Sequence, residues 1–119
     1  MKSYTELLVW QEAKALVKEV YVFTYDLPES EKFGIISQLR RAAVSVPSNI
    51  AEGIGRNHSK DILQFLFIAK GSLNELETLS YLCTDLNLGV AEKIPPLIDK
   101  IISVRKLLIG FIKYKQENQ

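Results

Sequence analysis

The sequence has little of the chemistry from which metal sites, disulfides and catalytic centres are usually built. Its 119 residues include one cysteine, Cys83, and one histidine, His58. One cysteine cannot form an intrachain disulfide, and one Cys with one His cannot supply the four ligands of a structural zinc site. His58 falls in a predicted loop and Cys83 in the apolar stripe of a predicted helix, so they form no nucleophilic pair. We therefore expect no metal, no cofactor and no enzymatic activity.

Phosphate-binding and di-iron motifs are also missing. Gly53, Ile54 and Gly55 begin like a dinucleotide-binding loop, but the third glycine is absent and the segment follows a predicted helix instead of a strand. The sequence contains no Gly-Lys-Ser/Thr phosphate loop and no Glu-x-x-His pair of the type that holds iron in helical bundles. These absences exclude the common nucleotide-dependent and di-iron enzymes.

Charge and hydropathy exclude further classes. Lys and Arg number 15 against 14 Asp and Glu, a net charge of +1, whereas dedicated nucleic-acid binders usually carry a strong basic excess. Nucleic-acid binding would therefore need a local basic patch or an oligomer that concentrates charge. No apolar run reaches the roughly 18 residues of a membrane span, and residues 1–6 lack the apolar core of a signal peptide. We expect a cytoplasmic protein with no membrane partner.

What the sequence does contain is a helical apolar pattern. Val9, Ala13, Leu16 and Val20 recur at steps of three and four residues, which places them on one helix face. The same period predicts helices over about residues 5–27, 31–54, 59–88 and 94–116. Because the links are short and no strand pattern competes, we expect one all-α domain over residues 1–119, an antiparallel up-down-up-down four-helix bundle.

Pro47 lies inside the second of these segments. A proline in a helix interior costs about 3 kcal/mol and normally breaks or kinks the helix. The apolar period nevertheless stays in phase on both sides of it, from Val46 to Ile50. The pattern therefore predicts one kinked helix instead of two.

The third segment is more apolar than a four-helix bundle requires. Phe65, Phe67 and Tyr81, with the aliphatic residues around them, cannot all face the other three helices. Surplus apolar surface usually marks an interface, although single exposed apolar residues are ordinary. The sequence therefore favours self-association, with these three aromatic residues as candidate contacts.

A polar stripe opposite the apolar face of the second helix gives further candidate interface residues. It contains Gln38, Arg41, Ser45 and Glu52, whereas a merely solvated face is more often rich in Lys and Glu. We predict that Arg41 and Glu52 pair across a subunit contact. The alternative is an ordinary hydrated helix face.

Five basic residues are candidate nucleic-acid contacts: Arg40, Arg41, Arg56, Lys60 and Lys70. Arg56 and Lys60 flank the predicted start of the third helix, whose N-terminal N–H groups attract phosphate. Basic residues scattered over an ordinary surface give the same pattern, so this footprint is a hypothesis.

Residues 37–53, Ser-Gln-Leu-Arg-Arg-Ala-Ala-Val-Ser-Val-Pro-Ser-Asn-Ile-Ala-Glu-Gly, form a distinctive motif. Further motifs follow the same order along the chain: Val9-Trp10-Gln11, Pro28 with Gly34, and Gly-Ser-Leu-Asn-Glu-Leu-Glu at residues 71–77. Through these motifs the chain resembles the four-helix bundle proteins encoded within 23S rRNA intervening sequences. The resemblance covers about residues 4–115.

The resemblance implies a left-handed up-down-up-down bundle that forms a ring-like homopentamer. A similar fold occurs in accessory proteins of diversity-generating retroelements, which bind nucleic acid and a reverse transcriptase. The implied function is a non-catalytic oligomeric scaffold whose partners are its own copies and RNA or a ribonucleoprotein. The alternative is a protein-binding adaptor, for example a partner of a reverse transcriptase, without direct nucleic-acid contact.

Two local expectations accompany this resemblance. Gly71 is expected to permit close approach of two helices. The side chain of Asn49 or Ser45 is expected to satisfy the carbonyl of Ala43, which loses its hydrogen bond to Pro47.

Overall fold

The computed structural model describes residues 3–118 and contains four α-helices: α1 (Leu8–Thr24), α2 (Ile35–Ile54), α3 (Ser59–Asp85) and α4 (Ile94–Glu117). Three short 3-10 turns, Tyr4–Glu6, Glu29–Glu31 and Ala91–Lys93, precede α1, α2 and α4. The described residues include no strand. The all-α class and the four helices predicted from the apolar period are confirmed.

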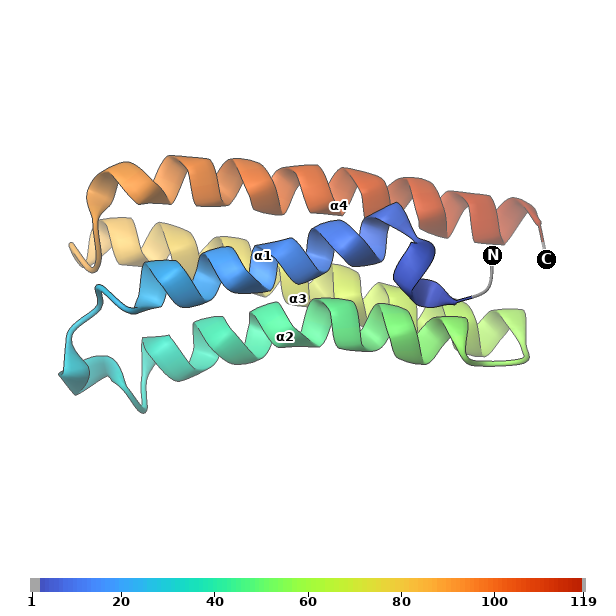
Figure 1. Cartoon of the computed structure of the whole chain (residues 1–119), viewed down its shortest axis with the longest axis horizontal. Helices are drawn as coiled ribbons and strands as arrows, with labels where there is room; N and C mark the ends of the chain where they lie inside the picture. Colours follow the sequence, from blue (N-terminus) through green and yellow to red (C-terminus); the bar gives the residue numbers. More distant parts are fainter. Residues whose placement is uncertain (1–2, 119) are drawn as a thin grey trace.

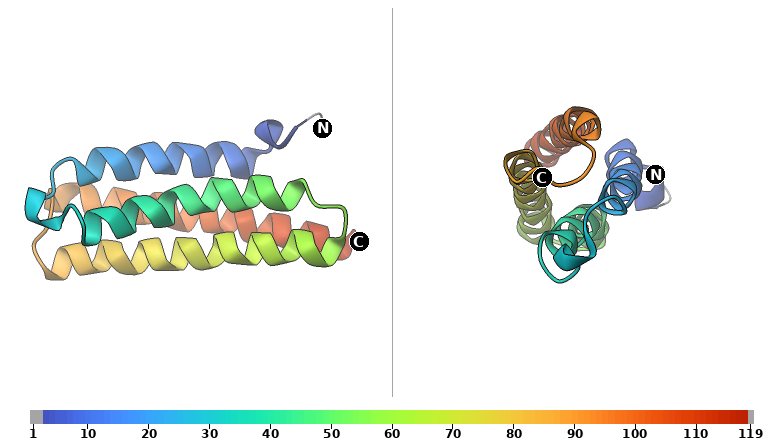
Figure 2. Two further views of the ribbon diagram at one scale, coloured as in Figure 1. Left: turned by 90° about the horizontal axis from the view of Figure 1, so that it is seen from below. Right: turned by 90° about the vertical axis from the view of Figure 1, so that its left-hand side faces the viewer.

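The helices lie along one long axis, in a bundle of 45 × 24 × 22 Å (Figure 1). The α1–α2 and α3–α4 links lie at one end, and the α2–α3 link lies at the other end with both chain termini. Each helix packs mainly against two neighbours, in the cyclic order α1, α2, α3, α4. The end-on view in Figure 2 shows the four helices around a common centre, so each helix keeps one outer face.

The predicted apolar stripes form the core of the bundle. Leu16, Leu39, Leu73 and Leu108, one from each helix, are fully buried. Burying a leucine side chain stabilises a fold by about 1.5–3 kcal/mol. The steps of three and four residues that predict the helices therefore also determine which face of each helix turns inward.

α2 passes through Pro47 as one helix, as the apolar phase predicts. The Nδ2 of Asn49 donates to the carbonyl oxygen of Ser45 at 2.8 Å and to its Oγ at 2.9 Å. The Ser45 Oγ also accepts a hydrogen bond from Ser72 on α3. The expectation that one of these side chains serves the carbonyl of Ala43 is wrong, because Asn49 reaches back one turn, to its i−4 carbonyl.

Both ends of α1, the start of α2 and the end of α3 differ from the predictions by three or four residues, and the other helix ends agree within one residue. α1 begins at Leu8 and α2 at Ile35, because separate 3-10 turns precede them. α3 ends at Asp85 because Asn87 has a φ of 55° and Gly89 a φ of 80°, left-handed values that terminate helices. A Cβ at Gly89 would also lie 2.9 Å from ring atoms of Phe23. The turn therefore requires glycine both for its positive φ and for the space beside Phe23.

Close approach of two helices occurs at Gly53 and not at Gly71. A Cβ added at Gly53 would lie 3.0 Å from the Cβ of Phe65 and 3.1 Å from the carbonyl oxygen of Ile62. The end of α2 therefore packs directly on the start of α3. A Cβ added at Gly71 would have no neighbour within 4 Å in the described part of the chain beyond its own helix. Within the subunit the expectation for Gly71 is wrong, because this glycine lies on the exposed side of α3.

Candidate functional site

The exposed side of α3 carries more large apolar side chains than the exposed side of any other helix. Phe67, Ile68, Tyr81 and Leu82 are each between 40% and 50% exposed. We call the surface formed by these four residues and Gly71 the α3 outer face. Phe67 and Tyr81 are thus exposed, as residues predicted to contact another copy of the chain must be.

Phe65, the third aromatic candidate on this helix, is placed differently. It is half-buried, it packs against Gly53 of α2, and the guanidinium of Arg56 lies over its ring at 4.7 Å. Its side chain therefore closes the junction between α2 and α3 within the subunit instead of extending the α3 outer face.

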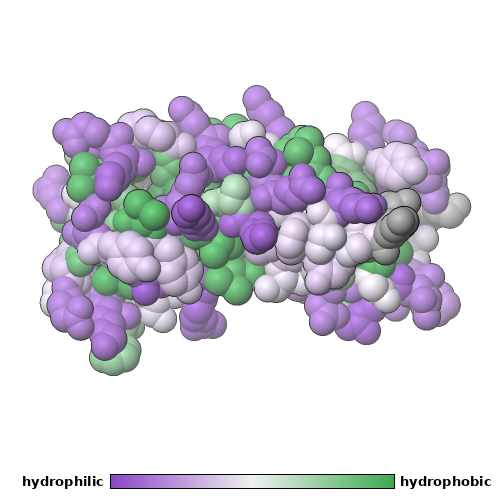
Figure 3. All heavy atoms as spheres, viewed as in Figure 1, coloured by the Kyte–Doolittle hydropathy of each residue, from purple (hydrophilic) through white to green (hydrophobic). Residues whose placement is uncertain are grey.

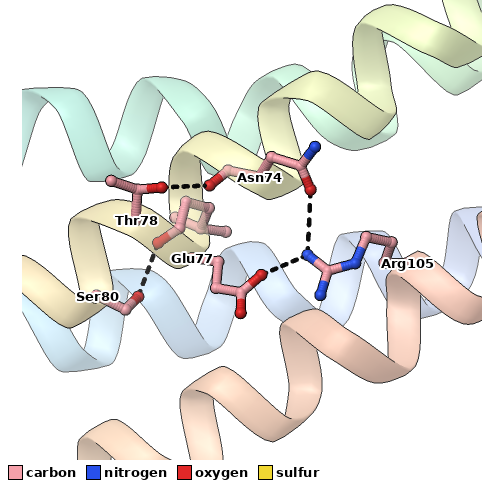
Figure 4. Close-up of polar contacts among 6 residues, drawn as sticks. Asn74, Glu77, Thr78, Ser80 and Arg105 are labelled. Atoms are coloured by element: carbon pink, nitrogen blue, oxygen red, sulfur yellow. Dashed lines mark hydrogen bonds and ion pairs between the residues drawn. The ribbon is translucent and has the colours of Figure 1, made fainter.

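A polar cluster joins α3 to α4 between the two aromatic parts of the α3 outer face. The Nη1 of Arg105 on α4 donates to Glu77 Oε1 at 2.6 Å and to Asn74 Oδ1 at 3.2 Å (Figure 4). Both members of the ion pair are about four-fifths buried, which strengthens it relative to a surface pair. Sequence reasoning missed this cluster because Glu77 and Arg105 belong to different helices.

The polar stripe of α2 is largely satisfied within the subunit. Ser45 Oγ accepts a 2.8 Å hydrogen bond from Ser72 Oγ on α3. Glu52 pairs with Arg56 at 3.0 Å, one helical turn further on. Gln38 and Arg41 remain exposed. The residues of this stripe therefore have different environments. Within the subunit Glu52 meets Arg56, and its pairing with Arg41 of another copy stays a prediction.

The five basic candidates separate into distant groups. Arg56 and the exposed Lys60 lie at the α2–α3 link, the end with both chain termini (Figure 2). Arg41 lies eleven residues before Glu52, which corresponds to about 16 Å along α2. Lys70 is half-buried in the middle of α3. The structure therefore does not assemble these residues into one patch.

Arg40 is held against α1 near the opposite end of the bundle. Its guanidinium carbon lies 4.4 Å from the ring centre of Tyr21 and 5.3 Å from that of Tyr25. Its Nε donates to Thr24 Oγ1 at 2.9 Å, and the Thr24 hydroxyl in turn donates to the carbonyl of Tyr21 at 3.0 Å. Thr24 is buried, so this arrangement fixes the guanidinium plane in one orientation.

An open hollow lies beside Arg40. We call it the α2 hollow, and its lining includes Tyr21, Lys32, Phe33, Arg40, Arg41 and Glu75. Phe33 is 91% exposed, the most exposed large apolar side chain among the described residues. The sequence offers a signal for this site: Tyr21 and Tyr25 share a helix face four residues apart, and Phe33 lies outside the apolar stripes. On the face formed by α1 and α2, apolar side chains form separate patches among hydrophilic ones (Figure 3).

The two residues with nucleophilic potential lie far from each other in the fold. Cys83 is fully buried near the end of α3, and burial, with a smaller contribution from the negative charge of Glu31, raises the pKa of its thiol to about 11. Such a thiol stays protonated and unreactive near neutral pH. His58 is exposed directly before α3 begins. Within residues 3–118, no cluster of three His, Cys, Asp or Glu residues is arranged to hold a metal ion.

None of the helices within the described part of the chain combines the length and apolar character needed to cross a membrane.

Comparison with known proteins identifies a family and a solved structure with a similar fold. Residues 5–110 match the family described as 23S rRNA-intervening sequence protein. The structure is similar to that of a protein of unknown function from the S23 ribosomal protein family of Bacteroides thetaiotaomicron VPI-5482, with a TM-score of 0.79 and 24% identity. The match covers 89% of this chain and 99% of the other, and at this identity it shows the fold alone. No curated protein matches the chain.

Proposed function

The chain belongs to the 23S rRNA-intervening sequence protein family, and from this premise we propose that it is a non-catalytic oligomeric scaffold that binds RNA. In this proposal the bundle is antiparallel and up-down-up-down, and copies assemble through the α3 outer face into a ring-like homopentamer. The partners are other copies of the chain and RNA or a ribonucleoprotein.

The α3 outer face is the observation that carries the proposal. Removing apolar surface from water contributes about 25 cal/mol per Å², and clustered apolar residues on a surface mark interaction sites. Gly71 leaves open space between Phe67 and Tyr81, where a second helix can approach closely. The Arg105–Glu77 ion pair holds α3 against α4, so the helix that carries this face is fixed in the bundle.

Assembly through this face is tested by substituting Phe67 with Glu. A buried, unpaired carboxylate at a subunit contact costs several kcal/mol, so the oligomer should dissociate while the subunit stays folded. Light scattering gives the mass and circular dichroism the helix content. The matched control is Val22→Glu, because Val22 has a similar exposed fraction, 45%, on α1. An unchanged mass for Phe67→Glu would remove the α3 outer face from the proposal.

The non-catalytic part of the proposal is supported by the environments of Cys83 and His58. The thiol is buried with a raised pKa, and the imidazole of His58 lies at the opposite end of α3. A hydrolase needs a nucleophile, a base and an orienting group within hydrogen-bond reach of one another, and these two side chains do not provide them.

The RNA-binding part is tested by fluorescence anisotropy with labelled RNA over a series of salt concentrations. Binding that neutralises phosphates weakens linearly in log–log form as salt rises, with a slope of about −0.7 per phosphate contact for single strands. The family description and the basic residues of α2 motivate this test. The proposal requires binding that persists at physiological salt.

A protein-binding adaptor is the second candidate function. The net charge of +1 and the apolar character of the α3 outer face favour it. Electrostatic attraction is strongest at low salt. If an intact oligomer does not bind RNA there, the adaptor function replaces the RNA-scaffold function as the proposal.

A further inference from the structure

The α2 hollow combines two kinds of group that bind nucleic acid. One is an exposed aromatic ring, Phe33, which stands in the turn directly before α2 and is 91% exposed. The other is a set of three cations in the lining, Lys32, Arg40 and Arg41, against one lining carboxylate, Glu75. The side chains that line the hollow therefore carry a net positive charge, although the chain as a whole is nearly neutral.

Arg40 has the geometry of a prepared phosphate contact. Of its guanidinium nitrogens, Nε is engaged with Thr24, whereas Nη1 and Nη2 make no hydrogen bond to the described residues. The rings of Tyr21 and Tyr25 contact the guanidinium without neutralising its charge. A guanidinium fixed in this way loses little conformational entropy when it binds a phosphate through its remaining N–H groups.

The other two cations stand on the solvent side of the hollow. Arg41 is exposed and follows Arg40 directly in sequence. Lys32 lies 5.6 Å from the ring centre of Phe33 and 3.9 Å from a carboxylate oxygen of Glu29. This ion pair is long and solvated, and surface pairs of this kind are weak, so a phosphate can compete for the ammonium group.

From these contacts we infer that the α2 hollow binds an unpaired stretch of RNA. A base stacks on the ring of Phe33, and the neighbouring phosphates lie against Arg40 and Arg41. Unpaired bases are needed because a base in a duplex is already stacked on both faces by its neighbours. Splayed bases are free to stack on aromatic side chains and arginine planes. This inference rests on the proposed function, since it locates the RNA site of the scaffold.

The experiment uses the full chain and a fluorescein-labelled oligouridine, with anisotropy measured over a salt series. Phe33→Ala should weaken binding about tenfold at every salt concentration, because stacking on one aromatic ring is removed and no charge changes. Arg41→Glu should weaken binding about tenfold at low salt and reduce the salt slope by about 0.7 for each phosphate that is no longer neutralised. The two variants thus give different signatures, which a general loss of structure would not reproduce.

Matched variants control for nonspecific effects. Tyr114→Ala removes an exposed aromatic ring from α4, and Lys106→Glu makes the same charge change as Arg41→Glu at an exposed position of that helix. Both should bind oligouridine like the wild type. Light scattering and circular dichroism should show the same mass and helix content for all four variants, since each altered side chain is exposed.

Four results would overturn the site. If both hollow variants bind like the wild type, RNA binds elsewhere and the proposed function stands without this site. If Phe33→Ala changes the oligomer mass, the hollow is a subunit contact. If duplex RNA binds as tightly as oligouridine, the hollow does not select unpaired bases. If the wild type binds no RNA at low salt, both the site and the RNA-binding function are wrong.

Discussion

Two arginines near opposite ends of α2 are stacked on aromatic rings, yet their charges have different surroundings. Arg40 lies 4.4 Å from the ring centre of Tyr21, and Arg56 lies 4.7 Å from that of Phe65. The Nε of Arg40 is bound by a neutral hydroxyl, that of Thr24. The Nη2 of Arg56 is bound by the carboxylate of Glu52 at 3.0 Å.

The difference shows that stacking alone does not make an arginine a phosphate contact. A hydroxyl positions the guanidinium without competing for its charge, whereas a carboxylate that positions it also competes with a phosphate for that charge. By this criterion the end of the bundle near Arg40 is suited to RNA, and the end near Arg56 is suited to holding α2 against α3.

The largest expected effect concerns the structural role of the Arg56 end. Gly53→Ala should lower the free energy of unfolding by about 1–3 kcal/mol, because the added methyl group meets Phe65 and the Ile62 carbonyl in a packed junction. Gly110→Ala is the control, at an exposed position of α4, and should raise it by about 0.5–1 kcal/mol, since alanine is the better helix former and the space there is open. Chemical denaturation measures both; a neutral Gly53→Ala would mean that the junction is loosely packed.

A smaller effect is expected at the Arg40 end. Thr24→Val keeps the shape of the buried side chain and removes the hydroxyl that orients Arg40, so stability should fall by about 1 kcal/mol. RNA affinity should fall as well, because the guanidinium is no longer fixed. Thr78→Val, at an exposed position of α3 where the hydroxyl donates to the Asn74 carbonyl, should leave RNA affinity unchanged. Wild-type affinity in Thr24→Val would show that orienting Arg40 is irrelevant to binding.

The smallest effect is expected when the charge of Arg56 is released. Glu52→Gln should change stability by no more than about 0.5 kcal/mol, because the ion pair is solvent-exposed. Anisotropy should give an RNA affinity within about twofold of the wild type at low salt, apart from the small gain expected from one fewer negative charge. If Glu52→Gln binds RNA much more tightly than the wild type, and adding Arg56→Ala abolishes that gain, the two ends do not differ as described and RNA binds at the Arg56 end.

The sequence predicts the fold better than the surfaces, for a physical reason. The apolar period depends on residues three and four apart, so it predicts the four helices. It also predicts that α2 continues past Pro47 as one helix, as observed. The helix ends were less accurate because 3-10 turns and left-handed residues such as Asn87 depend on local backbone geometry. Gly71 and Gly53 look alike in sequence, and only the packing of α3 on α2 distinguishes them.

The candidate sites depend on side chains that meet across helices. Exposure of Phe67 and Tyr81 followed from the surplus of apolar residues in one segment. The pairing of Glu52 with Arg56, one turn further on, was within reach of sequence reasoning, because residues four apart on a helix are neighbours. The contact of Arg40 with Thr24, and the hollow beside it, was not, since these residues are sixteen positions apart on two helices.

The most direct test of the RNA site is ultraviolet cross-linking of oligouridine to the wild-type protein, followed by trypsin digestion and mass spectrometry. Cleavage after Lys32 and Arg40 releases residues 33–40, and cleavage after Lys60 and Lys70 releases residues 61–70. We predict that the cross-linked base is found on the first peptide, at Phe33. Cross-links confined to residues 57–70, beside Arg56 and Phe65, would contradict the account.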